Sequence, residues 1–88
     1  MPYLMGRASM EDYAAFRKGF DGAEEERKAA GALGSRVFQS VDDPNEVIVE
    51  IEFSSAEAAQ AYMNSDGLRE RQQRASKQPT RMLVVNET

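Results

Sequence analysis

The chain has 88 residues, with no cysteine, histidine or tryptophan, and 15 acidic against 11 basic residues give a formal charge of −4. This length suits a single domain, residues 1–88, with one small core. Without cysteine or histidine there are no disulfides, thiolate nucleophiles, imidazole bases or usual zinc and haem ligands, so we expect no cofactor and no metal. The acidity argues against nucleic-acid binding. No apolar run approaches the roughly 20 residues of a membrane span, and we expect a cytoplasmic protein that does not bind membranes.

A short strand and a long helix are expected at the start of the chain. Residues 3–8 are mostly apolar and are typical of a strand. Ser9 and Asp12 have the spacing of a capping box, which predicts a helix from there to about Ala30. Gly31 is expected to end this helix in a left-handed conformation.

Two strands are expected next. Residues 36–41 and 46–53 are expected to pair as a hairpin through the short acidic turn between them. Along the second strand, apolar side chains alternate with glutamates, which indicates a sheet with one apolar and one mixed face. Pairing Val41 with Glu46 places Phe38 on the apolar face.

The rest of the chain predicts a broken helix and a last strand. A capping box at Ser54 predicts a helix as far as Met63. Small and polar residues at 64–67 interrupt it, a second segment covers 68–75, and residues 80–85 form a strand. The order β-α-β-β-α-β predicts a ferredoxin-like α+β fold, in which two helices cover one face of a four-stranded antiparallel sheet.

The second face of this sheet is expected to be too apolar to remain in water. A second copy of the chain packed against it would bury the face, and twofold dimers are the commonest oligomers, so we expect a homodimer. The residues expected at this dimer face are Val37, Gln39, Val41, Ile48 and Glu50.

Five segments share their sequence character with one known family: Pro2-Tyr3-Leu4, Glu11-Asp12-Tyr13, Arg27-Lys28-Ala29-Ala30-Gly31, Asp42-Asp43-Pro44-Asn45-Glu46 and Leu68-Arg69-Glu70. Together they resemble the small dimeric α+β barrel proteins related to the antibiotic biosynthesis monooxygenases. That family includes cofactor-independent monooxygenases that form quinones, haem-degrading enzymes and proteins with no known activity. The resemblance implies a dimer that closes a barrel, with a ligand between the helices and the sheet of each protomer.

The resemblance also implies which residues line that ligand cleft. They come from both helical regions and from the sheet: Tyr13, Phe16, Phe20, Phe38, Val49, Phe53, Tyr62, Met63 and Leu68. The aromatic members are also what a small domain needs to fill its core, and the two interpretations remain alternatives.

The polar residues used by the quinone-forming members point to Tyr62, Asn64 and Arg17 as catalytic candidates. The haem-degrading members use a histidine and a tryptophan, and this chain has neither, so haem degradation is not expected. The resemblance implies a cofactor-independent monooxygenase acting on a small aromatic or polyketide-like substrate. The lack of a strong acid, base or nucleophile favours an alternative, a non-catalytic homodimer that binds a small apolar ligand or serves as an interaction module.

Overall fold

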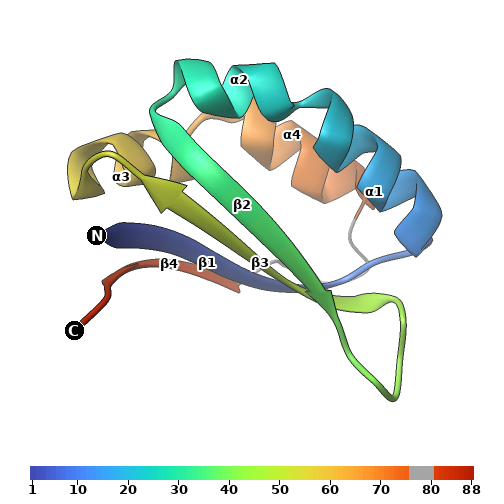
Figure 1. The fold of residues 1–88 in the computed structure, drawn as a ribbon. Coiled ribbons are helices and arrows are strands. Elements are labelled where there is room, and N and C mark those ends of the chain that lie inside the picture. The colour runs from blue at the N-terminus through green and yellow to red at the C-terminus, as the bar shows by residue number, and fades with distance from the viewer. Residues whose placement is uncertain (76–80) are drawn as a thin grey trace.

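The computed structural model describes residues 1–75 and 81–88, with side chains for 1–70 and 81–88. Within these ranges the strands form one antiparallel sheet in the order β2-β3-β1-β4, and the helices lie together on one side of it (Figure 1). This confirms the ferredoxin-like α+β fold. Thr80, expected to begin the last strand, lies outside the described residues. The elements are β1 (Pro2–Ser9), α1 (Tyr13–Gly22), α2 (Glu24–Ala29), β2 (Ala32–Gln39), β3 (Glu46–Phe53), α3 (Ala56–Met63), α4 (Asp66–Ala75) and β4 (Arg81–Asn86).

The first helical region is broken in two, where one helix was expected. Ala23, between α1 and α2, has φ −95° and ψ 8°, and it follows Gly22, a residue that disfavours helix interiors. The capping box expected at Ser9 is wrong because β1 pairs through Ser9. The N-cap is Asp12, whose Oδ1 accepts a hydrogen bond from the Ala14 amide at 3.0 Å.

The turn after α2 depends on glycine, as expected. Gly31 has φ 103°, a backbone conformation that residues other than glycine rarely adopt. A Cβ there would lie 3.1 Å from Ser54 Oγ and 3.3 Å from Ala58 Cβ. The Ser54 amide donates to the Gly31 carbonyl at 3.0 Å, so Ser54 closes this turn. The cap of α3 is the next residue, Ser55, whose Oγ accepts from the Ala58 amide at 3.0 Å.

The β2–β3 pairing differs by one residue from the expected register. Val37 lies opposite Val49, and Phe38 lies opposite Ile48. Because side chains alternate along a strand, a one-residue shift moves every side chain of β2 to the other face. Phe38, expected in the cleft, therefore lies on the face without helices. Val37 and Gln39, expected at the dimer face, lie on the helix side.

The turn explains this register. The Ser40 amide donates to the Glu46 carbonyl at 2.9 Å, so residues 41–45 form the loop, one residue longer than expected. The Asp43 carbonyl accepts from the Glu46 amide at 3.0 Å and closes the loop. Val41, expected on the strand and at the dimer face, lies in this loop and is completely exposed.

Two buried clusters lie between the sheet and the helices. One lies beneath α3 and the other beside the start of α1. No residue of α1 is fully buried, whereas α3 buries Ala59 and Tyr62. In the described ranges, no helix is long and apolar enough to cross a membrane. The buried members are Leu4, Ile51, Phe53, Ala59 and Tyr62 in the first cluster, and Ala8, Met10 and Val47 in the second.

Candidate functional site

The candidate site lies between α1–α2 and the centre of the sheet. Tyr13, Phe16 and Phe20 follow one face of α1, with ring centroids 6.1 Å and 5.7 Å apart in turn. All three rings are only partly buried, and so are Val37 and Val49 on the sheet. Apolar surface left half-exposed on both layers can be covered by a small apolar or aromatic molecule.

A buried arginine ends this aromatic row. Arg27 of α2 is 4% exposed, its guanidinium carbon lies 3.8 Å from the Phe20 ring centroid, and Nη1 donates to the Phe20 carbonyl at 2.7 Å. A guanidinium remains protonated at every physiological pH, so a permanent positive charge lies beside the aromatic row. Such a charge stabilises an oxyanion that forms near it. The sequence signal for Arg27 was its place on the same helix face as Phe20, about two turns later.

Tyr62 and Phe53 belong to the core. Phe53 is fully buried, Tyr62 is 5% exposed, and their ring centroids lie 5.7 Å apart. Met63 and Leu68 are partly buried and pack against the same cluster. The Ser65 hydroxyl donates to the Tyr62 carbonyl at 2.8 Å, which orders the turn between α3 and α4. Side chains of the protein itself therefore fill this end of the expected cleft.

The other two catalytic candidates lie on the surface. Arg17 is paired with Asp21 one turn later, with Nε 3.2 Å from Oδ1 and the Arg17 side chain 43% exposed. Asn64 follows the last turn of α3, and its Oδ1 accepts from Arg69 Nη2 at 3.4 Å. No described contact brings Tyr62, Asn64 and Arg17 together.

The face of the sheet without helices, called here the open face, carries large apolar side chains. Phe38, Ile48 and Leu83 are 46%, 45% and 57% exposed on it. Among them, Glu50 pairs with Arg36, whose Nη2 lies 2.6 Å from Glu50 Oε1. Of the residues expected at a dimer face, the structure places Ile48 and Glu50 on the open face.

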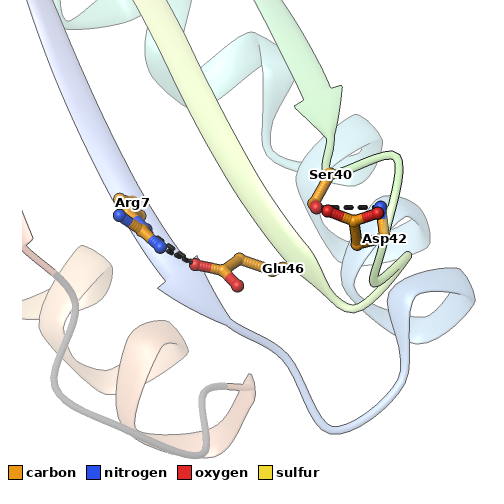
Figure 2. Close-up of polar contacts among 4 residues, drawn as sticks. All are labelled: Arg7, Ser40, Asp42 and Glu46. Carbon is orange, nitrogen blue, oxygen red and sulfur yellow. Dashed lines mark hydrogen bonds and ion pairs between the residues drawn. The ribbon is translucent and has the colours of Figure 1, made fainter.

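Polar contacts order one end of the open face (Figure 2). Arg7 of β1 donates from Nε to the Glu46 carboxylate of β3 at 2.7 Å. In the adjacent loop, the Asp42 amide donates to the Ser40 hydroxyl at 3.1 Å. Both charges of the Arg7–Glu46 pair are thus engaged within the chain.

A pocket of about 320 Å³ opens at the other end of the open face, and its lining is polar. The Tyr3 hydroxyl donates to Glu87 Oε1 at 3.0 Å. This hydrogen bond, then burial and the nearby Glu52 carboxylate, raise the pKa of Tyr3. The described side chains include no group of three or more acidic residues arranged to hold a metal ion. The lining residues are Tyr3, Gly34, Ser35, Arg36, Glu50 and Glu52.

Comparison with known proteins identifies the family. The sequence model of the antibiotic biosynthesis monooxygenase family matches residues 7–85. The chain therefore belongs to this family. A search of curated proteins returned no significant match.

Solved structures similar to this one cover nearly the whole chain. A Bordetella bronchiseptica protein given the same family name has a TM-score of 0.82 at 13% identity, over 99% of this chain and 96% of its own. A mutant of SnoaB, a cofactor-independent oxygenase from Streptomyces nogalater, has a TM-score of 0.78 at 11% identity, over 98% and 91%. A Nitrosomonas europaea protein of unknown function has a TM-score of 0.74 at 18% identity, over 96% and 85%. At these identities the similarity establishes a shared fold.

Proposed function

We propose that the protein is a cofactor-independent monooxygenase acting on a small aromatic, polyketide-like substrate. The observation that carries the proposal is the aromatic row of α1, which ends at the buried guanidinium of Arg27. Membership of the antibiotic biosynthesis monooxygenase family supports the reaction class, as does the shared fold with a cofactor-independent oxygenase.

In this proposal the substrate supplies the electrons. A phenolic anthrone loses a proton from its activated methylene group to water and becomes an enolate. The enolate reduces dioxygen, one oxygen atom remains as the new carbonyl of the quinone, and the other leaves as water. The protein holds the flat ring system against Phe16 and Phe20 and stabilises the anion with the charge of Arg27.

We assign the anion-stabilising role to Arg27 in place of Arg17. The Arg17 side chain is 43% exposed, so its field at the aromatic row is weakened by water. Arg27 is buried on the Phe20 ring, where its field is screened less. Tyr62 remains a candidate positioning residue through its packing on Phe53.

Oxygen uptake with a panel of anthrones and hydroquinones tests this assignment. The wild-type protein is expected to consume one dioxygen molecule per anthrone without added flavin or metal. Arg27→Lys should lower kcat at least about tenfold, because a lysine lacks the planar stacking that holds the charge on Phe20. Arg17→Lys should leave kcat unchanged. If Arg17→Lys is instead the variant that loses turnover, the role belongs to Arg17.

A non-catalytic homodimer that binds a small apolar ligand is the second candidate. It is favoured by the dispersal of the polar candidates Tyr62, Asn64 and Arg17, and by the filled end of the expected cleft at Phe53. Native mass spectrometry of protein purified from its source distinguishes the two functions. A retained apolar molecule with no oxygen uptake supports binding alone, and turnover of the anthrone panel contradicts it.

We also propose that the working unit is a homodimer. Phe38, Ile48 and Leu83 expose apolar surface on the open face, and the partly buried Met5 lies next to Leu83 on the neighbouring strand. Packing a second copy on this face removes that surface from water. Analytical ultracentrifugation at micromolar concentration should return the mass of two chains, and the mass of one chain would contradict the proposal.

A further inference from the structure

Met5 of β1 has a neighbour on each side in the strand register of the open face. Met5 lies opposite Glu50 on one neighbouring strand and opposite Leu83 on the other. Glu52 lies on β3, two residues along from Glu50, and Arg81 lies on β4, two residues from Leu83 in the opposite spatial direction. Glu52 and Arg81 therefore lie on opposite sides of Met5, at equal distances from it.

Glu52 and Arg81 carry opposite charges that no described side chain of the protein neutralises. The other two arginines of the open face are each paired with a glutamate of β3. Among the described side chains, those of residues 1–70 and 81–88, neither the Glu52 carboxylate nor the Arg81 guanidinium makes a hydrogen bond or an ion pair. A face with one free anion and one free cation on opposite sides of Met5 is complementary to a second copy of itself.

We propose that a second copy docks face to face on the open face. The twofold axis lies parallel to the two sheets and passes over Met5, so that Arg81 of each copy enters the pocket at Glu52 of the other. The proposal rests on the homodimer proposed above and specifies its register. Because a twofold interface is isologous, this ion pair forms twice.

The same axis also brings other residues of the open face into contact between the two copies. With strands about 4.8 Å apart and a rise of about 3.4 Å per residue, the axis that exchanges Glu52 and Arg81 also passes over Phe38. It therefore places the exposed Phe38 rings of the two copies against each other, and it brings Glu50 close to Arg7 of the second copy. The strands of the two sheets then cross at roughly 70°, near the orthogonal class of sheet packing.

The pocket at Glu52 has the chemistry that a guanidinium requires. Its volume of about 320 Å³ is sufficient for the end of an arginine side chain. The Tyr3 ring offers a cation–π surface and Glu52 a carboxylate. Arg36 also lines the pocket, and its charge is balanced by the ion pair with Glu50. Gly34 leaves the entrance clear, since a Cβ there would meet nothing within 4 Å. The raised pKa of Tyr3, caused first by its hydrogen bond to Glu87, then by burial and Glu52, fits a negative field that favours a cation.

Charge reversal tests the proposed register. Sedimentation equilibrium should show wild-type dimers, whereas E52R and R81E each place like charges together and should raise the dimer Kd at least about tenfold. An equimolar mixture of the two variants should recover a tight heterodimer, because both reversed charges then meet an opposite charge. The double variant E52R/R81E should likewise recover wild-type association.

Glu25→Arg is the matched control, a charge reversal on the helix side at a side chain that is 91% exposed, and it should leave the Kd unchanged. Circular dichroism checks that each variant is folded. If a reversal fails to fold, Glu52→Gln and Arg81→Gln carry the test, each with an expected rise in the dimer Kd of about threefold.

A monomeric wild type overturns the homodimer and the register together. A wild-type dimer that either reversal leaves unchanged, or that the mixture fails to recover, overturns the register alone.

Discussion

The guanidinium of Arg27 lies 3.8 Å from the centre of the Phe20 ring, and its Nη1 donates to the carbonyl of the same residue at 2.7 Å. No residue of α1 is fully buried, so this pair is a principal side-chain contact holding the end of α1 against α2. Arg27→Ala should lower the free energy of unfolding by about 2–4 kcal/mol, since a cation–π contact and a buried hydrogen bond are both lost. Urea denaturation measures the change.

Arg17 provides the matched control on the same ring. Its guanidinium carbon lies 5.7 Å from the Phe20 centroid, and its side chain is 43% exposed. Arg17→Ala should cost less than about 0.5 kcal/mol, because exposed cation–π and ion-pair contacts are weak. Equal losses in the Arg17 and Arg27 variants would contradict a special role for the buried pair.

The turn at Gly31 should tolerate no side chain. Gly31→Ala places a Cβ at φ 103° and 3.1 Å from Ser54 Oγ, and should lower stability by about 1–3 kcal/mol. Gly19→Ala, inside α1 with nothing within 4 Å of its Cβ, should raise stability by about 0.5–1 kcal/mol. Thermal unfolding of both variants compares the two glycines. A stabilised Gly31 variant would show that the turn does not depend on its left-handed conformation.

The hydrogen bond from Tyr3 to Glu87 predicts a pH dependence at the alkaline end. The pKa of Tyr3 is raised from its ordinary value of 10.0, first by this hydrogen bond, then by burial and by Glu52. The folded protein therefore favours the protonated phenol, and the associated stability is present below pH 10 and lost as the pH rises through the folded pKa. Between pH 9 and 11 the Tm of the wild type should fall more steeply than that of Tyr3→Phe. Parallel curves would show that Tyr3 does not contribute.

The open face predicts which apolar residues matter for association. Ile48→Glu places a charge beside Phe38 on the proposed interface and should dissociate the dimer, raising its Kd at least about a hundredfold. Val41→Glu should leave the Kd unchanged, because Val41 lies in the loop and is completely exposed. Gel filtration with light scattering measures both. Dissociation by the Val41 variant alone would place the interface at the loop.

The element order could be predicted because each element has a local signal. The alternation in β3 and the aromatic spacing in α1 depend on the chain's own periodicity. The register of β2 was not predictable in the same way, because the loop closes at Ser40 and not at Val41. Because the loop is one residue longer than expected, Phe38 lies on the open face and Val37 on the helix side.

The site was predicted less well than the fold, since it depends on which side chains tertiary packing buries. Arg17 and Arg27 both belong to the first helical region, and the sequence does not say which of them packs on Phe20. Arg27 follows the break at Ala23 and is buried, and no local sequence pattern specifies which of the two arginines becomes buried. Tyr62 and Phe53, expected either to line the cleft or to fill the core, pack on each other with their rings 5.7 Å apart.

Mass spectrometry of the product formed from an anthrone under isotopically labelled dioxygen tests whether the protein inserts oxygen into an aromatic substrate without a cofactor. The metal-free and flavin-free wild type should form quinone carrying one labelled oxygen atom, faster than buffer alone and faster than Arg27→Lys. Product formation at the rate of the buffer blank would contradict this prediction.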